Sequence, residues 1–252
     1  PTGLNGDTIR TRRLVGLARS ALALTYVRWY RLRTDKALIF DFNGTLFWDT
    51  EYHKAAWSAI SKRYRGVEVS RSESHHLNGR TNAETIAYLL GRNPTASEVR
   101  AISEEKEGLY EQICLANRPL TLAPGAVELI KAAKEQDIPV AIATSAGEDN
   151  IERYKKWFNL LSLFDESAII FDNGKRKGKP EPDIYLDACN ALGMEARLCT
   201  VFEDTRAGIQ SAYRAHIGSI IAVASPGSDT QTIKGMDGVH ALITDFSAYR
   251  LE

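Results

Sequence analysis

The sequence is poor in cysteine and carries no net charge, and each shortage excludes a class of protein. Its three cysteines, Cys114, Cys189 and Cys199, lack the spacing of a metal site and are too few for a disulfide framework in a chain of 252 residues. We therefore expect a reducing, cytoplasmic environment. Lys and Arg together number 32, as do Asp and Glu, so the chain lacks the basic excess that nucleic-acid binding normally requires. Small-molecule chemistry is the better expectation.

The N-terminal extension, residues 1–36, is the exception to this balanced charge. Arginines crowd it, and no acidic residue lies between Thr8 and Thr34. Its apolar residues recur at helical spacing, and Arg19 and Arg28 interrupt them, which favours an amphipathic helix over a membrane-spanning one. Three roles stay open: contact with its own protein or a partner, attachment to a membrane surface, or an acid-poor targeting sequence. The sequence indicates no oligomeric state.

Short apolar runs alternate with helix-length segments along the rest of the chain. The first run, Ala37–Phe40, ends at Asp41, as expected of a buried parallel strand that delivers a residue at its carboxyl end. Helix-length segments include 127–136 and 182–192. This alternation predicts an α/β fold with a doubly wound parallel sheet. Further strands are expected at 138–143, 168–171, 198–202, 219–223 and 240–244.

A long interval, residues 51–118, separates the first predicted strand from the second and shows helical patterns without a convincing strand. We expect an inserted helical cap there, with a catalytic core formed by residues 37–50 and 119–252. The last cap helix is expected to begin at Ser97, a suitable N-cap residue. The cap helices are predicted at 55–64, 82–90 and 97–115.

Polar side chains follow four of the predicted strands. In a doubly wound sheet a ligand binds beyond the carboxyl ends of the strands, so these groups should converge. Phosphoryl transfer needs a nucleophile, for which Asp41 is suited, and cationic or hydrogen-bonding groups, for which Lys179 and Thr144 are suited. Mg²⁺ prefers oxygen ligands, which Asp41, Asp204 and a backbone carbonyl near Asn43 could supply. The complete set is Asp41 with Asn43, Gly44 and Thr45; Thr144 with Ser145; Lys179; and Glu203 with Asp204.

These groups lie in four segments, in the order ALIFDFNGTLFWDTEYHKAAW, AIATSAG, GKPEPDIYLDA and TVFEDTRAGIQSA. The segments resemble the four ordered motifs of the haloacid dehalogenase-like superfamily. The cap position and the stretches DTEYHKAAW and LNGRTNAET resemble its β-phosphoglucomutase and phosphoglycolate-phosphatase-like branch. The resemblance implies that Asp41 is the nucleophile and that Thr144 and Lys179 bind phosphate. It also implies that Asp204 binds Mg²⁺ and that Glu203 supports the metal directly or through water.

Asn43 departs from the family pattern, in which most phosphatases and mutases have a second Asp at this position. That Asp is the family's general acid and base, and a neutral amide cannot replace it. Positioned acid–base catalysis contributes roughly 10²- to 10⁴-fold, so we expect a slowed site with intact metal and phosphate binding. Dehalogenases of the superfamily also lack this Asp but need no metal, and the pair Glu203 and Asp204 argues against that interpretation.

Three residues outside the motifs are further candidates for substrate binding. Arg80 aligns with a cap loop that the resembled enzymes lower onto the substrate, and the alternative is an exposed loop arginine. Lys106 either reaches the cleft or is a solvated surface lysine among neighbouring glutamates. His53 lies near the junction of core and cap, where a structural role is the alternative to a functional one.

The leading functional hypothesis is a Mg²⁺-dependent phosphatase that hydrolyses a small, sugar-phosphate-like monoester through an aspartyl phosphate, a reaction that Asn43 would slow. One alternative is a hexose phosphate mutase similar to β-phosphoglucomutase, which would need the base that Asn43 lacks. The other is a weakened phosphate sensor or scaffold. Cap loops choose the substrate, so the fold alone does not name it.

Overall fold

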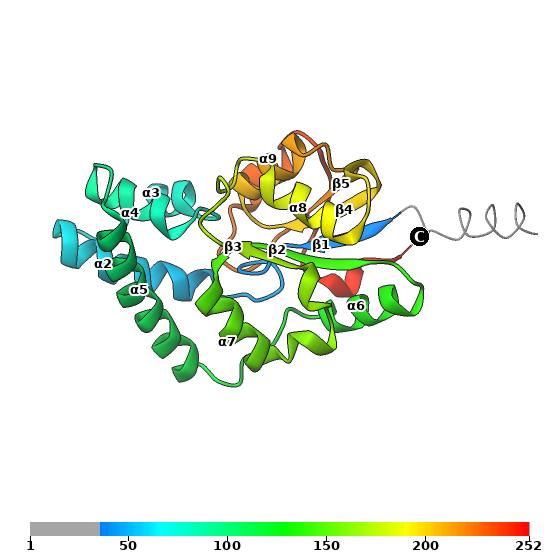
Figure 1. Cartoon of the computed structure of the whole chain (residues 1–252), viewed down its shortest axis with the longest axis horizontal. Coiled ribbons are helices and arrows are strands. Elements are labelled where there is room, and N and C mark those ends of the chain that lie inside the picture. The colour runs from blue at the N-terminus through cyan, green and yellow to red at the C-terminus, as the bar shows by residue number, and fades with distance from the viewer. Residues whose placement is uncertain (1–35, 252) are drawn as a thin grey trace, which may run out of the picture. The chain divides into compact units, whose positions relative to one another are not determined.

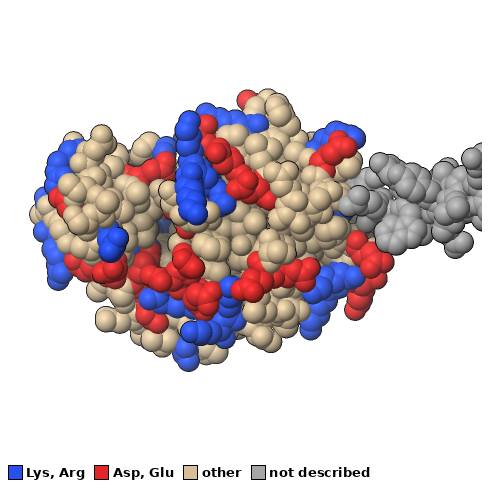
Figure 2. Space-filling model, viewed as in Figure 1, with Lys and Arg blue, Asp and Glu red and all other residues tan. Residues whose placement is uncertain are grey.

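The structure is a computed structural model that describes residues 36–251. The hypotheses about the N-terminal extension therefore lie outside the described residues. Among the described helices, none is both long and apolar enough to cross a membrane. Figure 2 shows basic and acidic side chains interspersed over the visible face of this part of the chain.

A six-stranded parallel sheet forms the centre of the described residues, with strand order β3-β2-β1-β4-β5-β6 (Figure 1). The predicted parallel α/β sheet is confirmed. Strand β2 differs from its prediction because its backbone continues past the apolar run and pairs Gly147 with Asp172 of β3. The strands are β1 (Ala37–Phe40), β2 (Val140–Gly147), β3 (Ile169–Asp172), β4 (Cys199–Glu203), β5 (Ser219–Val223) and β6 (Val239–Ile243).

Helices cover both faces of this sheet. Alternate residues of a strand point to opposite faces, and β1 shows the result: Leu38 and Phe40 pack in one buried cluster, whereas Ala37 and Ile39 pack in another. The first cluster includes apolar residues of α6 (Ala126–Glu135) and α7 (Glu148–Phe158). The second includes those of α8 (Asp183–Leu192), α9 (Arg206–Arg214) and α10 (Thr230–Lys234). Burial on both faces explains why the strands are almost uniformly apolar.

Between β1 and β2 the chain forms a helical insertion of α2 (Thr50–Arg65), α3 (Arg71–Leu77), α4 (Asn82–Leu90) and α5 (Ala96–Ala116). These helices gather beyond one end of the sheet in Figure 1. They share a buried cluster of their own, formed by Ile60, Leu77, Ile86, Leu89 and Ile102. The division into separate core and cap domains stays a prediction.

Three details of the insertion differ from the sequence expectation. Helix α2 begins at Thr50 and not at residue 55. Helix α5 has Thr95, not Ser97, as its N-cap, because the Thr95 hydroxyl accepts from the Glu98 amide and Glu98 reaches back to the Thr95 amide. Helix α3 was not expected, although Ser70 and Glu73 form a capping box of the same kind. A helix of seven residues has too few turns to show a clear apolar period.

Candidate active site

Lys179 lies between two carboxylates at the carboxyl edge of the sheet. Its Nζ is 2.6 Å from Asp41 Oδ1, just after β1, and 2.6 Å from Glu203 Oε1, the last residue of β4. It also donates to the carbonyl oxygen of Ala143 at 3.2 Å. The Lys179 side chain is 1% exposed, so these ion pairs form away from water. The ends of β1 and β4, with the Ala143 carbonyl of β2, therefore place one cation against a candidate nucleophile.

Asp41, Glu203 and Asp204 bring carboxylate oxygens within 4.8 Å of one another. Both oxygens of Glu203 already accept hydrogen bonds: Oε1 from Lys179 and from Tyr185 (3.0 Å), and Oε2 from the amide and hydroxyl of Thr205. Asp204 has one hydrogen bond to Oδ1, from the Thr45 hydroxyl at 3.1 Å. Asp41 and Asp204 are therefore better placed than Glu203 to offer an oxygen to a cation.

The charge of this cluster is not balanced by Lys179. Burial raises the pKa of Asp41 to about 7 against the lowering effect of Lys179, and Glu203 adds to the rise. Burial, with repulsion from Glu203 and Asp41, also raises the pKa of Asp204 well above its usual value. Burial alone would lower the pKa of Lys179, but the two carboxylates raise it overall, so the lysine stays charged. Carboxylate oxygens with surplus negative charge fit a hard divalent cation such as Mg²⁺.

The turn after β1 is shaped by Gly44, which has φ of +83° and lies directly against Asp204. A Cβ at this position would lie 2.2 Å from Asp204 Oδ2, so a side chain is excluded by space as well as by backbone conformation. Thr45 is fully buried, and its hydroxyl donates a hydrogen bond to Asp204 Oδ1. Thr45 thus bonds to Asp204, and Gly44 leaves the space that the Asp204 carboxylate occupies.

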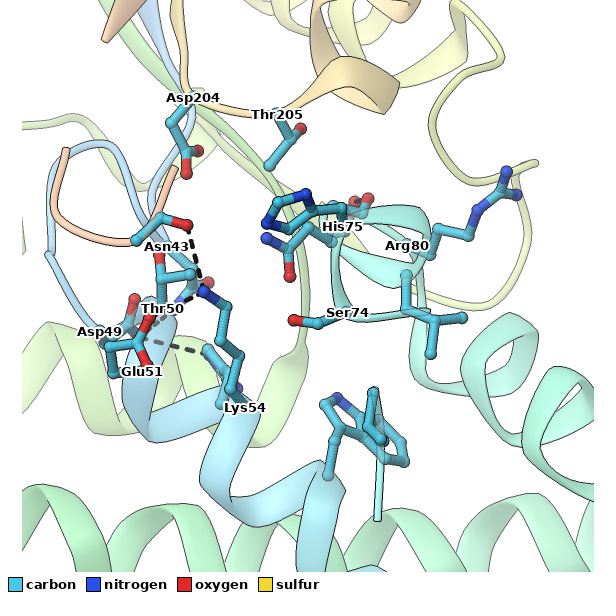
Figure 3. A pocket seen from close by; sticks show the side chains of 18 of the residues that line it. Asn43, Asp49, Thr50, Glu51, Lys54, Ser74, His75, Arg80, Asp204 and Thr205 are labelled. Carbon is cyan, nitrogen blue, oxygen red and sulfur yellow. Dashed lines mark hydrogen bonds and ion pairs between the residues drawn. The ribbon is translucent and has the colours of Figure 1, made fainter. Parts of the chain in front are cut away.

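A cavity of about 790 Å³ opens above Asp41 and is lined by residues of both the sheet edge and the helical insertion. In Figure 3, Asp204 and Thr205 lie on one side, Ser74 and His75 of α3 lie across from them, and Lys54 rises from α2. The insertion meets the sheet edge directly, since Ser145 Oγ donates to the carbonyl oxygen of Gly79 at 2.9 Å. The cavity is therefore covered from the side of the insertion.

Thr144 and Asn43 face each other at the floor of this cavity. The Thr144 hydroxyl donates to Asn43 Oδ1 at 3.4 Å and accepts from the amide of Ala146 at 3.1 Å. Both residues line the cavity with Asp41 and Ser145. The structure thus brings together the strand-end groups that the sequence singled out, although their individual roles stay predictions.

Sequence reasoning missed three residues that contact Asn43 or its partners. The Asn43 amide donates to Asp49 Oδ2 and to the hydroxyl of Tyr154, both at 2.7 Å, and the Tyr110 hydroxyl also donates to Asp49 in a short hydrogen bond. Asp49, Tyr110 and Tyr154 are each fully buried. Asp49 opens the stretch DTEYHKAAW, but the tyrosines are distant in sequence and carry no local signal.

His53 and Lys106 form a second group of contacts on the insertion side. His53 Nδ1 lies 2.8 Å from Lys106 Nζ, and His53 Nε2 lies 3.3 Å from Asp49 Oδ2. Lys106 also pairs with Glu107 at 2.9 Å, and its side chain is 2% exposed. The solvated surface alternative for Lys106 is therefore wrong, because the lysine is buried between a ring and a carboxylate at the wall of the cavity.

Arg80 lines the cavity but does not extend toward the carboxylates. Its guanidinium lies 3.7 Å from Glu84, one helical turn along, and points away from Asp204 in Figure 3. Its role in substrate binding stays a prediction. Lys54, another basic side chain that lines the cavity, lies closer to the sheet edge than Arg80 does (Figure 3). It donates to the carbonyl oxygen of Gly227 at 3.1 Å.

The structure is therefore an α/β fold whose parallel sheet carries an aspartate, a lysine and an acidic pair at its carboxyl edge, with helices inserted after the first strand. Residues 36–216 match the family model described as haloacid dehalogenase-like hydrolase, and the chain belongs to this family. Similarity to the β-phosphoglucomutase and phosphatase branch confirms the resemblance drawn from the motifs.

Two curated relatives and one crystal structure illustrate this similarity. Validoxylamine A 7'-phosphate phosphatase of Streptomyces hygroscopicus subsp. limoneus is 29% identical over 72% of this chain and 83% of its own length. β-Phosphoglucomutase of Bacillus subtilis is 28% identical over 70% of this chain and 78% of its own. A HAD hydrolase of family IA, variant 3, from Entamoeba histolytica is 37% identical, covers 86% of this chain and 96% of its own, and has a TM-score of 0.76.

Proposed function

We propose that the chain is a Mg²⁺-dependent phosphatase that hydrolyses a small, sugar-phosphate-like monoester through an aspartyl phosphate on Asp41. The observation that carries the proposal is the position of Asp41 at the floor of the cavity, with Lys179 2.6 Å from Oδ1. The lysine holds one carboxylate oxygen and leaves the other for attack on phosphorus. A buried nucleophile with a fixed orientation needs little reorganisation during the reaction.

The groups around Asp41 are suited to hold a transferring phosphoryl group. Thr144 and Ser145 line the cavity beside Asp41 and offer hydroxyl groups. Catalysis of phosphoryl transfer rests largely on positioning and on stabilisation of the nonbridging oxygens. In the proposal these donors, with Lys179, provide that stabilisation.

The bound cation is proposed from the carboxylate oxygens that could coordinate it. Asp41 and Asp204 would hold it, and Glu203 would support it by fixing Lys179 and Thr205. When bound, Mg²⁺ neutralises charge on the phosphoryl oxygens and lowers the cost of bringing an anionic substrate to buried carboxylates. The raised pKa values of Asp41 and Asp204 support a cation requirement, because burial and mutual repulsion disfavour the two charged carboxylates unless a cation joins them.

The amide of Asn43 favours hydrolysis over isomerisation at this site. A mutase must return the phosphoryl group to a sugar hydroxyl, which calls for a base at the position of Asn43. The relative named as a phosphatase of validoxylamine A 7'-phosphate supports hydrolysis of a phosphate monoester, and a cavity of about 790 Å³ has room for a sugar ring. We therefore prefer hydrolysis to isomerisation for this chain.

The proposal is tested by phosphate release from a panel of sugar phosphates and aryl phosphates, with Mg²⁺ or with excess chelator. We expect Mg²⁺-dependent release that Asp204→Asn reduces by at least about 10²-fold. Asp237→Asn, an exposed aspartate outside the site, is the matched control and should behave as wild type. Release that continues in excess chelator would contradict the metal dependence, and an isomerised sugar in place of phosphate would favour the mutase.

A further inference from the structure

Four buried side chains form a closed ring of hydrogen bonds behind the floor of the cavity. The amide nitrogen of Asn43 donates to Asp49 Oδ2 and to the Tyr154 hydroxyl, each at 2.7 Å. The Tyr154 hydroxyl donates to the Tyr110 hydroxyl at 3.0 Å, and the Tyr110 hydroxyl donates to Asp49 Oδ2. Tyr154 belongs to α7 of the sheet layer and Tyr110 to α5 of the insertion, so the ring joins the two parts.

The direction of every hydrogen bond in the ring follows from Asp49. A carboxylate only accepts, so Tyr110 and Asn43 must both donate to it. Tyr110 has then used its proton and accepts from Tyr154, and Tyr154 has used its proton and accepts from Asn43. Burial, with the nearby Asp49, raises the pKa of both tyrosines, so their hydroxyls keep these protons. The Asp49 carboxylate, which only accepts, thus fixes the direction of all four hydrogen bonds.

The consequence for Asn43 is a fixed amide orientation. Both hydrogens of its NH₂ group are committed to the ring, and its carbonyl oxygen is turned to the other side, where the Thr144 hydroxyl donates to it. Thr144 and Asn43 line the cavity beside Asp41. The group that Asn43 presents to the phosphate site is therefore an acceptor.

We propose that Asp49 is a positioning residue for phosphoryl transfer, and that Asn43 and Asp49 act as a matched amide and carboxylate pair. The inference rests on the proposed phosphatase function and adds a residue to it. Through the ring, Asp49 keeps the carbonyl oxygen of Asn43 directed at the water or leaving group, which it orients without removing a proton. The favoured substrates are esters whose leaving group departs with little proton transfer.

The pairing also predicts that an aspartate at position 43 alone would be disfavoured in this chain. A carboxylate there would lie 2.7 Å from Asp49 Oδ2 with no hydrogen between the two oxygens. Tyr154 would also have to reverse its donation to satisfy the new acceptor. An exchange of both residues lets the four bonds of the ring reverse, because an amide at position 49 would donate to the carboxylate at position 43. His53 Nε2, 3.3 Å from Asp49 Oδ2, would lose its acceptor in that exchange. The oxygen of that new amide could still accept from the backbone amide of Gly44, which now donates to Asp49.

Four proteins test the pairing: wild type, Asn43→Asp, Asp49→Asn and the double exchange. Each is assayed for kcat and KM with 4-nitrophenyl phosphate and with glucose 6-phosphate, and for thermal unfolding. We expect Asp49→Asn to lower kcat by at least about 10-fold with little change in KM, since orientation matters most in the transition state. Asn43→Asp should gain no turnover and should unfold at a lower temperature.

The double exchange should restore most of the unfolding temperature and raise kcat for glucose 6-phosphate about 10-fold or more above the Asn43→Asp protein. Equal kcat values for Asn43→Asp and the double exchange would overturn the pairing, as would additive losses of unfolding temperature. If a single variant fails to fold, Tyr154→Phe breaks the ring while keeping its packing and should lower kcat but not KM. Tyr213→Phe, on an exposed tyrosine, is its control. An unchanged kcat in Tyr154→Phe would refute the inference.

The outcome separates this inference from the phosphatase proposal. If the wild-type protein releases no phosphate from any ester in Mg²⁺, the proposed function fails, while the unfolding temperatures of the four proteins still report on the coupling of residues 43 and 49. If phosphate release is metal-dependent but the exchange shows no coupling, the function stands and the positioning role of Asp49 is wrong.

Discussion

Lys179 Nζ and Asp41 Oδ1 are 2.6 Å apart in a pocket that excludes water from the lysine almost completely. A buried charge without its partner is costly, so this contact ties the stability of the fold to the orientation of the candidate nucleophile. The same lysine holds Glu203 at 2.6 Å, and loss of the cation would leave two carboxylates facing each other.

Replacement of Lys179 should therefore damage both folding and turnover. We expect Lys179→Met to lower the free energy of unfolding by about 3 to 5 kcal/mol and to abolish phosphate release, as measured by urea denaturation and a phosphate assay. Lys177→Met removes an exposed lysine two residues away and should have little effect. A stable and active Lys179→Met protein would show that another cation balances Asp41.

Asp41→Asn should keep the fold and eliminate turnover. The change preserves the volume of the side chain but removes the attacking oxygen. We expect intact mass spectrometry of the wild-type protein with an aryl phosphate to detect one added phosphoryl group, because Asn43 cannot activate the water that hydrolyses an aspartyl phosphate. The Asp41→Asn protein should show no such adduct. An adduct that persists in this variant would place the nucleophile elsewhere.

Gly44→Ala separates backbone strain from steric conflict at the site. Gly44 and Gly66 both have positive φ, +83° and +78°, but a Cβ at Gly44 would lie 2.2 Å from Asp204 Oδ2, whereas nothing lies within 4 Å of one at Gly66. Each change should cost about 1 to 2 kcal/mol through the left-handed backbone. Gly44→Ala should in addition displace Asp204 and raise the Mg²⁺ concentration needed for half-maximal activity.

A Gly66→Ala protein, by contrast, should keep the wild-type Mg²⁺ dependence. Titration of activity with Mg²⁺ and thermal unfolding of both variants make the comparison. Identical metal dependence in the two variants would mean that Asp204 does not need the position it occupies beside Gly44.

Glu107 should give the protein a pH-dependent stability. Although burial opposes the shift, Lys106 and His53 lower the pKa of Glu107 to about 2 from an ordinary value of 4.5. A lowered folded-state pKa stabilises the protein above the unfolded value, and this contribution is lost as the pH falls from about 4.5 to about 2. The shift corresponds to about 3 kcal/mol at neutral pH.

The measurement is the free energy of unfolding of wild type and Glu107→Gln as a function of pH. The two proteins should differ by about 3 kcal/mol at about pH 7 and converge as the pH approaches about 2. Glu104→Gln, on an exposed glutamate of the same helix, is the control and should follow wild type. A difference that stays constant over the whole range would mean that ionisation of Glu107 is not what stabilises the fold.

Much of the fold and the strand-end part of the site followed from local sequence. Buried parallel strands are short apolar runs, and their carboxyl ends meet at one edge of the sheet, so Asp41, Thr144, Lys179 and Asp204 could be brought together without coordinates. Their order along the chain also carried the family resemblance. The strands and the motifs can be recognised in the sequence because each depends only on a few neighbouring residues and on a regular spacing.

Only the tertiary structure decided what surrounds Asn43. Its partner Tyr154 lies 111 residues away along the chain. The local sequence around Tyr154 and Tyr110 does not distinguish them from tyrosines that only fill a core. Local glutamates made Lys106 resemble a surface residue, yet packing of α5 against α2 buries it beside His53. The orientation of a side chain is set by contacts between distant segments. Asn43 could therefore be recognised from sequence as a missing base, whereas its pairing with Asp49 required the packing of α7 and α5 around it.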